Sequence, residues 1–274
     1  QIRYMLTTPP KINGYCLITG ASQGIGRAIS HEWASRGVSI VAVAIDGEAL
    51  KVLKEEIEST YDVSCITLTK DLLDPETPRE VFDWCMENDI DVQVLVNNVG
   101  LGSSGSFEDT SMEFDICLVK LNIFPMIQLT KLFLPVLKKF DKSYILNMSS
   151  LGSYRPIPYK ALYTASKAFI YSFSKAISSE LKEDSVQVSV SCPAGVYTNA
   201  DTVRRIKVSG MIAKWTSLYA DMVASSIVNG MLRGKDLIIP GKGAKLLKVL
   251  MTLMPENFNR WMVGRNMKRN RRAV

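Results

Sequence analysis

Short apolar runs alternate along this chain with segments of helical pattern, and this alternation restricts the fold more than any other feature. The runs lie at residues 15–19, 38–44, 63–69, 92–96, 143–148, 186–191 and 236–239, and the helical segments lie at 25–35, 48–59, 75–87, 112–139, 161–182 and 219–232. Strands that are apolar throughout are typical of a parallel sheet covered on both faces. We therefore predict an α/β fold with a doubly wound parallel sheet of about seven strands and helices on both faces.

Composition excludes several classes of protein. The chain is 47% hydrophobic, enough for a large core, yet none of its apolar runs approaches the 20 or so residues that cross a bilayer. We see no signal peptide, and the five cysteines lack CxxC spacing. We therefore expect a cytoplasmic protein with buried, reduced thiols. A single histidine, His31, argues against a Ser-His-Asp hydrolase and a multi-histidine metal site, and we expect no metal.

The net charge of +6 is concentrated at one end of the chain. Residues 241–274 hold nine Lys/Arg and one acid, Glu256, so this end carries +8 and the remainder −2. Because the body is nearly neutral, we expect no nucleic-acid partner. Leucines recur among these basic residues in two amphipathic helical pieces, 246–254 and 258–267. This end could lie on an anionic membrane surface, and it could equally be a solvated terminus or an oligomer contact.

A glycine-rich turn follows the first predicted strand and opens the first predicted helix. It reads Thr19-Gly20-Ala21-Ser22-Gln23-Gly24-Ile25-Gly26. Glycines let the backbone pass close to a phosphate, and the helix N-terminus supplies free N–H groups. The spacing is GxxxGxG rather than GxGxxG, and a glycine cluster alone can be a tight turn. Its place in the first strand-turn-helix unit indicates dinucleotide binding.

Ser150, Tyr163 and Lys167 form a second group. Tyr163 and Lys167 are four residues apart on one face of a helix, and Ser150 follows the fifth strand, at the sheet edge where α/β proteins bind ligands. A nearby ammonium lowers a tyrosine pKa, so the phenol could exchange a proton with a carbonyl or alcohol oxygen. A second YxxxK pair, Tyr171 and Lys175, lies two turns further on, and we interpret it as structural and remote from Ser150.

Taken together, these motifs resemble those of the short-chain dehydrogenases/reductases in order and spacing. The match also rests on Asn97-Asn98-Val99-Gly100, Asn122 and Pro193-Ala194-Gly195, and it runs from about residue 11 to residue 198. The chain departs from the family at Val99, where Ala is usual, and at Pro193-Ala194-Gly195, where Pro-Gly is commoner. The resemblance implies a Rossmann-type fold, a bound NAD(H) or NADP(H), and oxidation or reduction at a carbonyl or alcohol carbon. The basic end is similar to those of family members that act on lipids and steroids.

The resemblance also implies residue roles. Tyr163 would be the catalytic acid/base, Lys167 would hold the nicotinamide ribose and tune Tyr163, and Ser150 would position the substrate oxygen. Asn122 would support a proton-relay water near Lys167. Asp71 matches the position that contacts adenine, Asn98 lies on the adenosine ribose side, and Val196 and Thr198 match the segment that touches the carboxamide. The expected cofactor contacts are Gly20, Ser22, Gln23, Gly24, Ile25, Gly26, Ile45, Asp46, Asp71, Leu72, Asn98, Val99, Gly100, Tyr163, Lys167, Pro193, Val196 and Thr198.

The choice between the two cofactors depends on the end of the second strand. An NAD enzyme usually has an acid there for the ribose 2′-hydroxyl, whereas this chain has Ala44 or Ile45 and places Asp46 one position later. The basic residues typical of NADP enzymes are missing too, since Ile45 and Gln23 occupy those positions. Because no acid sits squarely at the strand end, we favour NADP(H) over NAD(H). Asp46 would otherwise be a solvated residue that starts the next helix.

We expect one domain over residues 1–274, with a cofactor-binding and catalytic core at 11–198, a substrate lid at 199–218 and a basic C-terminal extension at 241–274. The lid contains Val203, Ile206, Val208, Met211, Ile212 and Trp215. If these residues face the cleft, the substrate is a bulky apolar ketone or alcohol of fatty acyl, sphingoid or steroid type; they could instead pack on the core. The resemblance implies a homo-oligomer, a dimer or a tetramer.

Two other functions fit the same scaffold. A non-catalytic dinucleotide-binding sensor or scaffold could share the fold, but it would not need all of Ser150, Tyr163 and Lys167. An epimerase or dehydratase on a related scaffold usually has a longer chain. The expected activity is therefore that of an oxidoreductase in a protein that is cytoplasmic, and membrane-associated if the basic end binds lipid.

Overall fold

The computed structural model describes residues 12–103, 105–199, 202–204, 206 and 210–255. Its strands are β1 (Tyr15–Thr19), β2 (Ile40–Ala44), β3 (Cys65–Thr69), β4 (Val92–Asn97), β5 (Ser143–Met148), β6 (Val186–Ser191), β7 (Val196–Tyr197), β8 (Leu218–Tyr219) and β9 (Leu237–Ile238). Its α-helices are α1 (Gly24–Ala34), α2 (Gly47–Thr60), α3 (Thr77–Glu87), α4 (Met112–Leu137), α5 (Ala161–Glu180), α7 (Gly210–Thr216), α8 (Ala220–Leu232) and α9 (Lys242–Leu253). Two short 3₁₀ helices are η1 (Phe107–Asp109) and η2 (Leu151–Tyr154).

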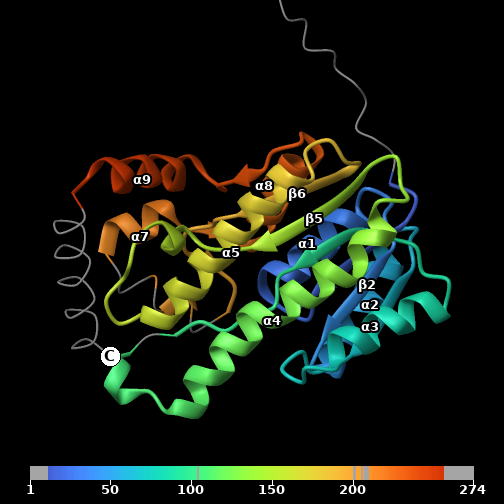
Figure 1. Cartoon of the computed structure of the whole chain (residues 1–274), viewed down its shortest axis with the longest axis horizontal. Coiled ribbons are helices and arrows are strands. Elements are labelled where there is room, and N and C mark those ends of the chain that lie inside the picture. Colours follow the sequence, from blue (N-terminus) through green and yellow to red (C-terminus); the bar gives the residue numbers. More distant parts are fainter. Residues whose placement is uncertain (1–11, 104, 200–201, 205, 207–209, 256–274) are drawn as a thin grey trace, which may run out of the picture.

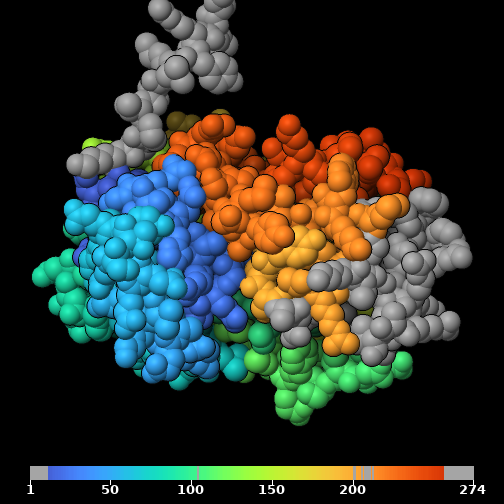
Figure 2. All heavy atoms as spheres, turned by 180° about the vertical axis from the view of Figure 1, so that it is seen from behind, coloured from blue at the N-terminus to red at the C-terminus, as the bar shows by residue number. Residues whose placement is uncertain are grey.

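Seven parallel strands form one sheet in the order β3-β2-β1-β4-β5-β6-β9. One apolar cluster packs this sheet against α1, α2 and α8, and a second cluster packs its other face against α3, α4 and α5. Figure 1 shows α3, α4 and α5 in front of the sheet, and Figure 2 shows from behind the blue N-terminal third beside the orange segment that contains α8. The predicted doubly wound sheet of about seven strands is confirmed.

The element bounds follow from burial. β2, β4 and β5 are buried along their whole length, because helices cover both of their faces. β1, β5 and β6 begin and end where the sequence predicts. The short elements η1, η2, α7, β7 and β8 were not predicted, because pieces of two to seven residues are too short to show a periodic pattern. α9 confirms the first helical piece of the basic end, and the second piece lies outside the described residues.

α4 is long and apolar enough to cross a membrane by length and composition, and it is the one such helix among the described residues. The sequence of α4 contains no unbroken apolar run of such length, because four charged residues interrupt it: Glu113, Asp115, Lys120 and Lys131. Its buried residues, Leu129, Phe133 and Leu137 among them, pack against the sheet in the second apolar cluster. α4 therefore acts as a core helix in this structure.

The strand order reverses between β1 and β4, and this point locates the candidate site. β1 leads outward to β2 and β3, whereas β4 leads to β5 and β6 on the other side. In doubly wound sheets the crevice at the carboxyl ends of such strands is where ligands bind. The glycine-rich turn follows β1, and Asn98 to Gly100 follow β4, so two of the predicted motifs flank this crevice.

Candidate active site

The glycine-rich turn between β1 and α1 is packed so closely that it leaves no room for a side chain at its last glycine. A Cβ on Gly26 would lie 2.2 Å from the carbonyl oxygen of Gly20 and 2.5 Å from the Asn98 amide nitrogen. Gly24 has a φ of +58°, in the region that favours glycine. The backbone path itself therefore requires these glycines, as a close approach to a phosphate does.

The first turn of α1 fits the diphosphate of a dinucleotide. Its N-cap residue, Gln23, makes no side-chain capping bond in the described structure, and the first turn holds no acidic residue. Free N–H groups with no neighbouring carboxylate attract an anion. Ser22 and Ile25 are half-buried beside the turn. Thr198 closes over it, with its Cγ2 3.2 Å from where a Gly24 Cβ would lie.

Asn98 holds this turn in place. Its side-chain amide donates to the carbonyl oxygens of Thr19 (2.9 Å) and Gly20 (3.2 Å). The backbone amides of Asn98 and Val99 donate to the Thr19 hydroxyl at 3.0 and 3.1 Å. The Asn98 amide expected on the adenosine ribose side therefore ties the end of β4 to the end of β1, which is a contact that its motif alone does not reveal.

Ser150, Tyr163 and Lys167 come together at the carboxyl end of β5. Ser150 is the N-cap of η2, and its Oγ accepts a hydrogen bond from the Gly152 amide at 3.1 Å. Tyr163 lies in the first turn of α5, where its phenol is half-buried. Lys167 is only 6% exposed. Its Nζ donates to the carbonyl oxygen of Met148 at 2.9 Å and lies 6.0 Å from the centroid of the Tyr163 ring.

Burial shifts the two ionisable groups in opposite directions. It raises the pKa of the Tyr163 phenol above its ordinary value; the Ser150 hydroxyl opposes this shift and Cys192 adds to it. It lowers the pKa of the Lys167 ammonium from 10.5 to about 8, against an opposing effect of Cys192. The predicted lowering of the phenol pKa is therefore wrong for the structure as described. The reason is that desolvation outweighs the other influences on the phenol, while the Lys167 ammonium donates to Met148.

The Asn122 side chain makes three hydrogen bonds within the protein. Its Oδ1 accepts from the Leu101 amide at 2.7 Å, and its Nδ2 donates to the Leu101 carbonyl at 3.0 Å and to the Ser166 hydroxyl at 2.9 Å. Gly100 lies close by, since a Cβ there would be 2.8 Å from Asn122 Oδ1 and 3.4 Å from Lys167 Nζ. Asn122 thus reaches the Lys167 region as predicted, and its amide anchors the segment after β4.

Two serines that were not predicted hold α5 in register. The Ser149 hydroxyl donates to the backbone carbonyl of Lys167 at 2.7 Å, and the Ser166 hydroxyl donates to that of Tyr163 at 2.8 Å. Both serines are nearly fully buried. Nothing in a single sequence distinguishes them from other serines in a helix or at a strand end, so only the structure reveals them.

The residues expected at the adenine end are grouped around the ends of β2 and β3. Ile45 is 68% exposed. The exposed Asp46 caps α2, because its carboxylate accepts from the Ala49 amide at 3.0 Å. The Asp71 carboxylate accepts from the Leu73 amide at 2.9 Å, and Leu72 is buried. Both acids therefore have a local backbone partner.

The segment after β6 borders the catalytic group. The Pro193 carbonyl accepts from the Leu151 amide at 2.8 Å, which joins this segment to η2. Val196 is buried and pairs with Leu218 in the short β7–β8 sheet. The Gly195 carbonyl accepts from the Leu218 amide at 3.1 Å, so the last residue of the predicted lid is bound to the segment that precedes the lid.

The lid itself divides between inward and outward side chains. Ile206 is 6% exposed and lies close to Gly195, whereas Met211 and Trp215 are 86% and 60% exposed. Val203 is half-buried. Val208 and the side chain of Ile212 lie outside the described residues. Ile206 is therefore buried against the segment after β6, whereas Met211 and Trp215 point to solvent, so the lid side chains do not all face the same way.

The second YxxxK pair has structural contacts. Lys175 forms an ion pair with Asp236, beside β9. The Tyr171 ring packs 5.0 Å from that of Tyr154, in the cluster that contains η2. The structural interpretation agrees with these contacts, but Tyr171 is nearer to the Ser150 segment than the spacing along the helix predicted, because η2 folds back over α5.

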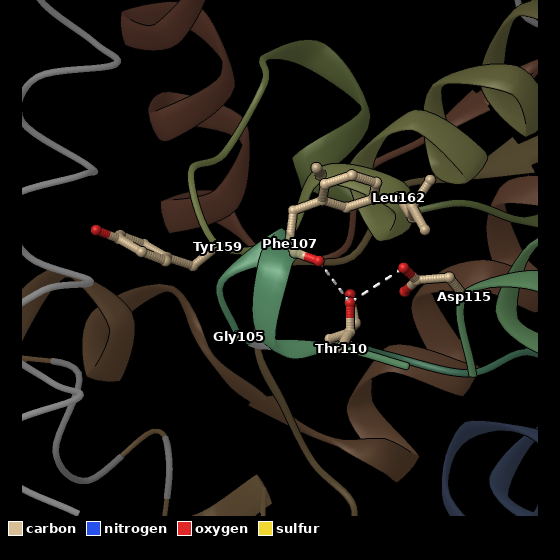
Figure 3. Close-up of a pocket in the computed structure, with 8 residues that line it drawn as sticks. Gly105, Phe107, Thr110, Asp115, Tyr159 and Leu162 are labelled. Carbon is tan, nitrogen blue, oxygen red and sulfur yellow. Dashed lines mark hydrogen bonds between the residues drawn. The ribbon is translucent and has the colours of Figure 1, made fainter. Parts of the chain in front are cut away.

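A small pocket of about 40 Å³ borders the start of α5 (Figure 3). It is lined by Ser103, Gly105, Phe107, Thr110, Asp115, Tyr159, Ala161 and Leu162. The Thr110 hydroxyl lies 3.1 Å from both the Asp115 carboxylate and the Phe107 carbonyl, and the Gly105 amide donates to the Tyr159 carbonyl at 2.9 Å. Leu162 precedes Tyr163, so the pocket lies next to the catalytic helix. It was not predicted, because its lining comes from loops and from the ends of three helices, and these residues form no sequence motif.

The chain is similar to known dehydrogenases and reductases over about two thirds of its length. The family model described as short chain dehydrogenase matches residues 15–208. The chain is 36% identical over 189 residues to 17-beta-hydroxysteroid dehydrogenase type 3 of Mus musculus, and the aligned residues cover 67% of this chain and 60% of that protein. It is 35% identical over 205 residues to the very-long-chain 3-oxoacyl-CoA reductase of Meyerozyma guilliermondii, which covers 71% of this chain and 60% of that protein.

A solved structure of a 7beta-hydroxysteroid dehydrogenase has the same fold. It superposes with a TM-score of 0.80 at 21% identity and covers 92% of this chain and 96% of its own. The chain spans about 60% of the length of the two curated relatives, so their activities do not transfer to it directly. The family model, in contrast, matches well over half of the chain and includes the glycine-rich turn, Ser150, Tyr163 and Lys167. The chain therefore belongs to the short-chain dehydrogenase family.

Proposed function

We propose that this chain is a nicotinamide-dependent oxidoreductase that moves a hydride between NAD(P)(H) and a carbonyl or secondary alcohol. The observation that carries the proposal is the convergence of Ser150, Tyr163 and Lys167 at the carboxyl end of β5, one strand from the crevice beside the glycine-rich turn. An acid/base group and a hydroxyl thus lie beside a turn that fits a diphosphate. The names of the two curated relatives, a dehydrogenase and a reductase, support this activity.

In carbonyl reduction, a bound NAD(P)H supplies the hydride to the carbonyl carbon. Tyr163 donates its phenolic proton to the carbonyl oxygen, which becomes the alcohol hydroxyl. Ser150 holds that oxygen through its hydroxyl. Lys167 holds the ribose and stabilises the phenolate that remains on Tyr163. Oxidation uses the same groups in reverse.

The proposed substrate is a bulky apolar ketone or alcohol of the steroid, fatty acyl or sphingoid class. Its support is the apolar composition of residues 199–218 and the substrates in the relatives' names, a hydroxysteroid and a very-long-chain 3-oxoacyl-CoA. The pocket beside Leu162 adds apolar walls from Phe107 and Leu162 at the edge of the catalytic helix.

The proposed cofactor is NADP(H) rather than NAD(H). The apolar Ile45 occupies the strand end, where an acid would repel a 2′-phosphate. Asp46 is the nearest acid, and its carboxylate is engaged by the Ala49 amide. The apolar residue at the strand end and the engaged carboxylate of Asp46 both support a preference for NADP(H) over NAD(H).

The alternative function is a non-catalytic sensor or scaffold that binds a dinucleotide. It needs the glycine-rich turn but no proton donor. The buried Lys167 argues against it, because placing an ammonium in the interior is unfavourable and the fold itself does not need one there. We therefore favour the enzyme.

We also propose peripheral contact with anionic membranes through the basic end. α9 carries Lys242, Lys245 and Lys248 without an acid, and it exposes Leu246 and Leu253. Basic and apolar side chains together favour the surface of an anionic bilayer. Arg260, Lys268 and Arg269 lie outside the described residues. A cytoplasmic location with membrane association is the corresponding proposal.

The decisive experiment compares the two YxxxK tyrosines. The wild type is screened for cofactor oxidation on a panel of ketones with NADH and NADPH. Tyr163→Phe removes only a hydroxyl, and it should lower turnover by about 10²–10⁴-fold while the cofactor still binds. Tyr171→Phe, which also removes only a hydroxyl, should stay within a few-fold. Equal effects of the two substitutions would refute the assignment of Tyr163.

A further inference from the structure

The orientation of the Ser150 hydroxyl depends on the path of η2. The Gly152 amide donates to Ser150 Oγ at 3.1 Å, and the Ser153 amide donates to the Ser150 carbonyl at 2.9 Å. With one lone pair occupied by Gly152, the Ser150 hydroxyl proton is free to turn toward the Tyr163 side. A displacement of η2 would therefore rotate or shift this hydroxyl.

α9 contacts η2 and the residue that follows it. Arg155, the residue after η2, donates from Nε to the Met251 carbonyl at 3.0 Å and from Nη2 to the Thr252 carbonyl at 3.2 Å. The last carbonyls of a helix lack partners within the helix, and a cation there interacts favourably with the helix dipole. Arg155 thus caps the C-terminus of a helix that is almost 100 residues further along the chain.

Two more contacts join the same elements. Leu151 of η2 shares an apolar cluster with Ala244 and Met251 of α9. The Lys248 ammonium lies 5.5 Å from the centroid of the Tyr154 ring, a distance typical of a cation–π contact. α9 therefore contacts the beginning and the end of η2, while Arg155 fixes the chain as it leaves.

We propose that Arg155 is a positioning residue that couples α9 to the active site, so that the C-terminal helix sets the orientation of the Ser150 hydroxyl. This proposal rests on the proposed function only for its effect on turnover. Arg155 does not contact the reacting atoms. Its effect passes through the α9 carbonyls and η2 to Ser150.

The test uses the full chain with three variants. Arg155→Met keeps an apolar stem and removes both donors, Arg155→Lys keeps one charged donor, and Arg79→Met is the control. Arg79 forms an ion pair with Asp83, and both residues lie on α3. This helix packs on the face of the sheet opposite to α1 and α8, and it has no residue in the apolar cluster that contains η2. Hydrogen exchange is followed at the amides of Gly152 and Ser153, and turnover is measured on a short soluble ketone.

In Arg155→Met we expect the amides of Gly152 and Ser153 to exchange at least about tenfold faster. We also expect kcat to fall about tenfold with unchanged cofactor affinity, because a small misplacement of a group that positions the substrate is costly to catalysis. Arg155→Lys should recover part of both effects, and Arg79→Met should change neither. If Arg155 acts through Ser150, then Arg155→Met should change turnover less than twofold in a Ser150→Ala background.

Each contrary result has a separate meaning. Unchanged exchange at Gly152 and Ser153 in Arg155→Met overturns the coupling. An equal loss of turnover in the Ser150→Ala background overturns its route through Ser150. A wild type without turnover defeats the proposed function alone, since the exchange measurement still decides whether Arg155 and α9 hold η2. If Arg155→Met does not fold, Arg155→Lys supplies the same comparison with one donor fewer.

Discussion

Burial shifts the pKa values of the two ionisable residues of the site in opposite directions. It raises the pKa of the Tyr163 phenol, because a buried phenolate is poorly solvated, and it lowers the pKa of the Lys167 ammonium to about 8, because a buried ammonium is poorly solvated too. A protonated phenol can donate to a carbonyl oxygen at neutral pH, whereas alcohol oxidation requires the phenolate.

The lowered pKa of Lys167 predicts a pH-dependent contribution to folding stability. Between its folded pKa of about 8 and the ordinary 10.5, the unfolded chain binds a proton that the folded chain does not, so this contribution to stability rises with pH. The full gain is about 3 kcal/mol, since one pKa unit corresponds to about 1.4 kcal/mol. Urea unfolding of wild type and Lys167→Met at pH 7, 8 and 9.5 should therefore show wild type gaining about 2 kcal/mol relative to the variant between pH 8 and 9.5.

The comparison removes the contribution of the shifted groups that do not interact with Lys167, because they occur in both proteins; Cys192, whose thiol interacts with Lys167, is the exception. Cys16, Cys65, Cys85 and Tyr144 have pKa values that burial raises, and they lower stability as the pH rises. Their effect cancels in the difference. Stability curves that run parallel from pH 7 to 9.5 would mean that Lys167 titrates normally and is not desolvated.

Asp46 gives a second prediction, on the cofactor. Asp46→Ser keeps an N-cap for α2, since serine caps helices as well as aspartate does, and it removes the charge. If NADP(H) is the natural cofactor, wild type already prefers NADPH and the substitution changes little. If Asp46 binds the ribose 2′-hydroxyl, the substitution should weaken NADH binding and strengthen NADPH binding. Isothermal titration with both cofactors distinguishes these cases.

The control for this experiment is Asp74→Ser, because the Asp74 carboxylate also accepts from a nearby backbone amide, that of Glu76 at 2.9 Å. It should leave both affinities unchanged. A wild-type preference for NADH of about tenfold or more, equivalent to about 1.4 kcal/mol, would refute the NADP(H) proposal.

The residue types and their spacing predicted which side chains gather at the site, but not which partners they bind. Ser150, Tyr163 and Lys167 meet as expected because β5 and α5 bring a strand end and a helix face together. The amides of Asn98 and Asn122 and the carboxylate of Asp46 instead bind nearby backbone groups. An amide or carboxylate can serve a ligand or the backbone equally well, and only the three-dimensional path of the chain decides between them.

At the scale of elements, burial explains which parts the sequence predicts. β5 and β6 are buried on both faces, so their apolar runs end where their pairing ends. η2 and the β7–β8 pair are held by contacts with distant segments, such as the Pro193 carbonyl and the Gly195 carbonyl, and short sequences carry no sign of such contacts. These unpredicted pieces are the ones that shape the cleft around Ser150.

The exposed faces of α4 and α5 suggest where the homo-oligomer that the family resemblance implies would form. Ile116 and Phe124 of α4 are 47% and 56% exposed, and Phe169 of α5 is 41% exposed and stacks on Phe173. Covering these side chains with a second copy would remove apolar area from water. We expect wild type to sediment as a dimer or tetramer, and Phe124→Asp or Phe169→Asp to shift it to the monomer.

Val52→Asp is the matched control for the oligomer, because Val52 is 47% exposed on α2, away from α4 and α5. It should not change the sedimentation coefficient. A monomeric wild type, or dissociation by Val52→Asp alone, would rule out the α4–α5 contact.

At the scale of the whole molecule, the site is assembled from the entire length of the described chain. The glycine-rich turn comes from its start, Ser150 and Tyr163 from its middle, and the outer support of η2 from α9 at residues 242–253. The doubly wound parallel sheet could be predicted from the alternation of helices and strands, since few architectures satisfy it, whereas the order of its strands comes from the structure. The return of α9 onto η2 could not be predicted, because it depends on Arg155 finding two carbonyls almost 100 residues away.

The charge distribution gives the last prediction, on the proposed membrane contact. Residues 257–274 hold six of the nine basic residues of the C-terminal extension, and each contributes about 1 kcal/mol near an anionic surface. The full chain should sediment with phosphatidylserine liposomes at low salt and should not sediment with neutral phosphatidylcholine liposomes. It should dissociate as salt is added, because the Debye screening length falls to about 8 Å at 0.15 M salt. Deleting Asn257 to Val274 should abolish binding yet leave turnover on a short ketone nearly intact, because the proposed reacting groups precede Thr198 and Arg155 keeps its acceptors at Met251 and Thr252. If the deletion leaves liposome binding unchanged but unfolds the protein or splits an oligomer, this segment is a packing element and the membrane proposal fails.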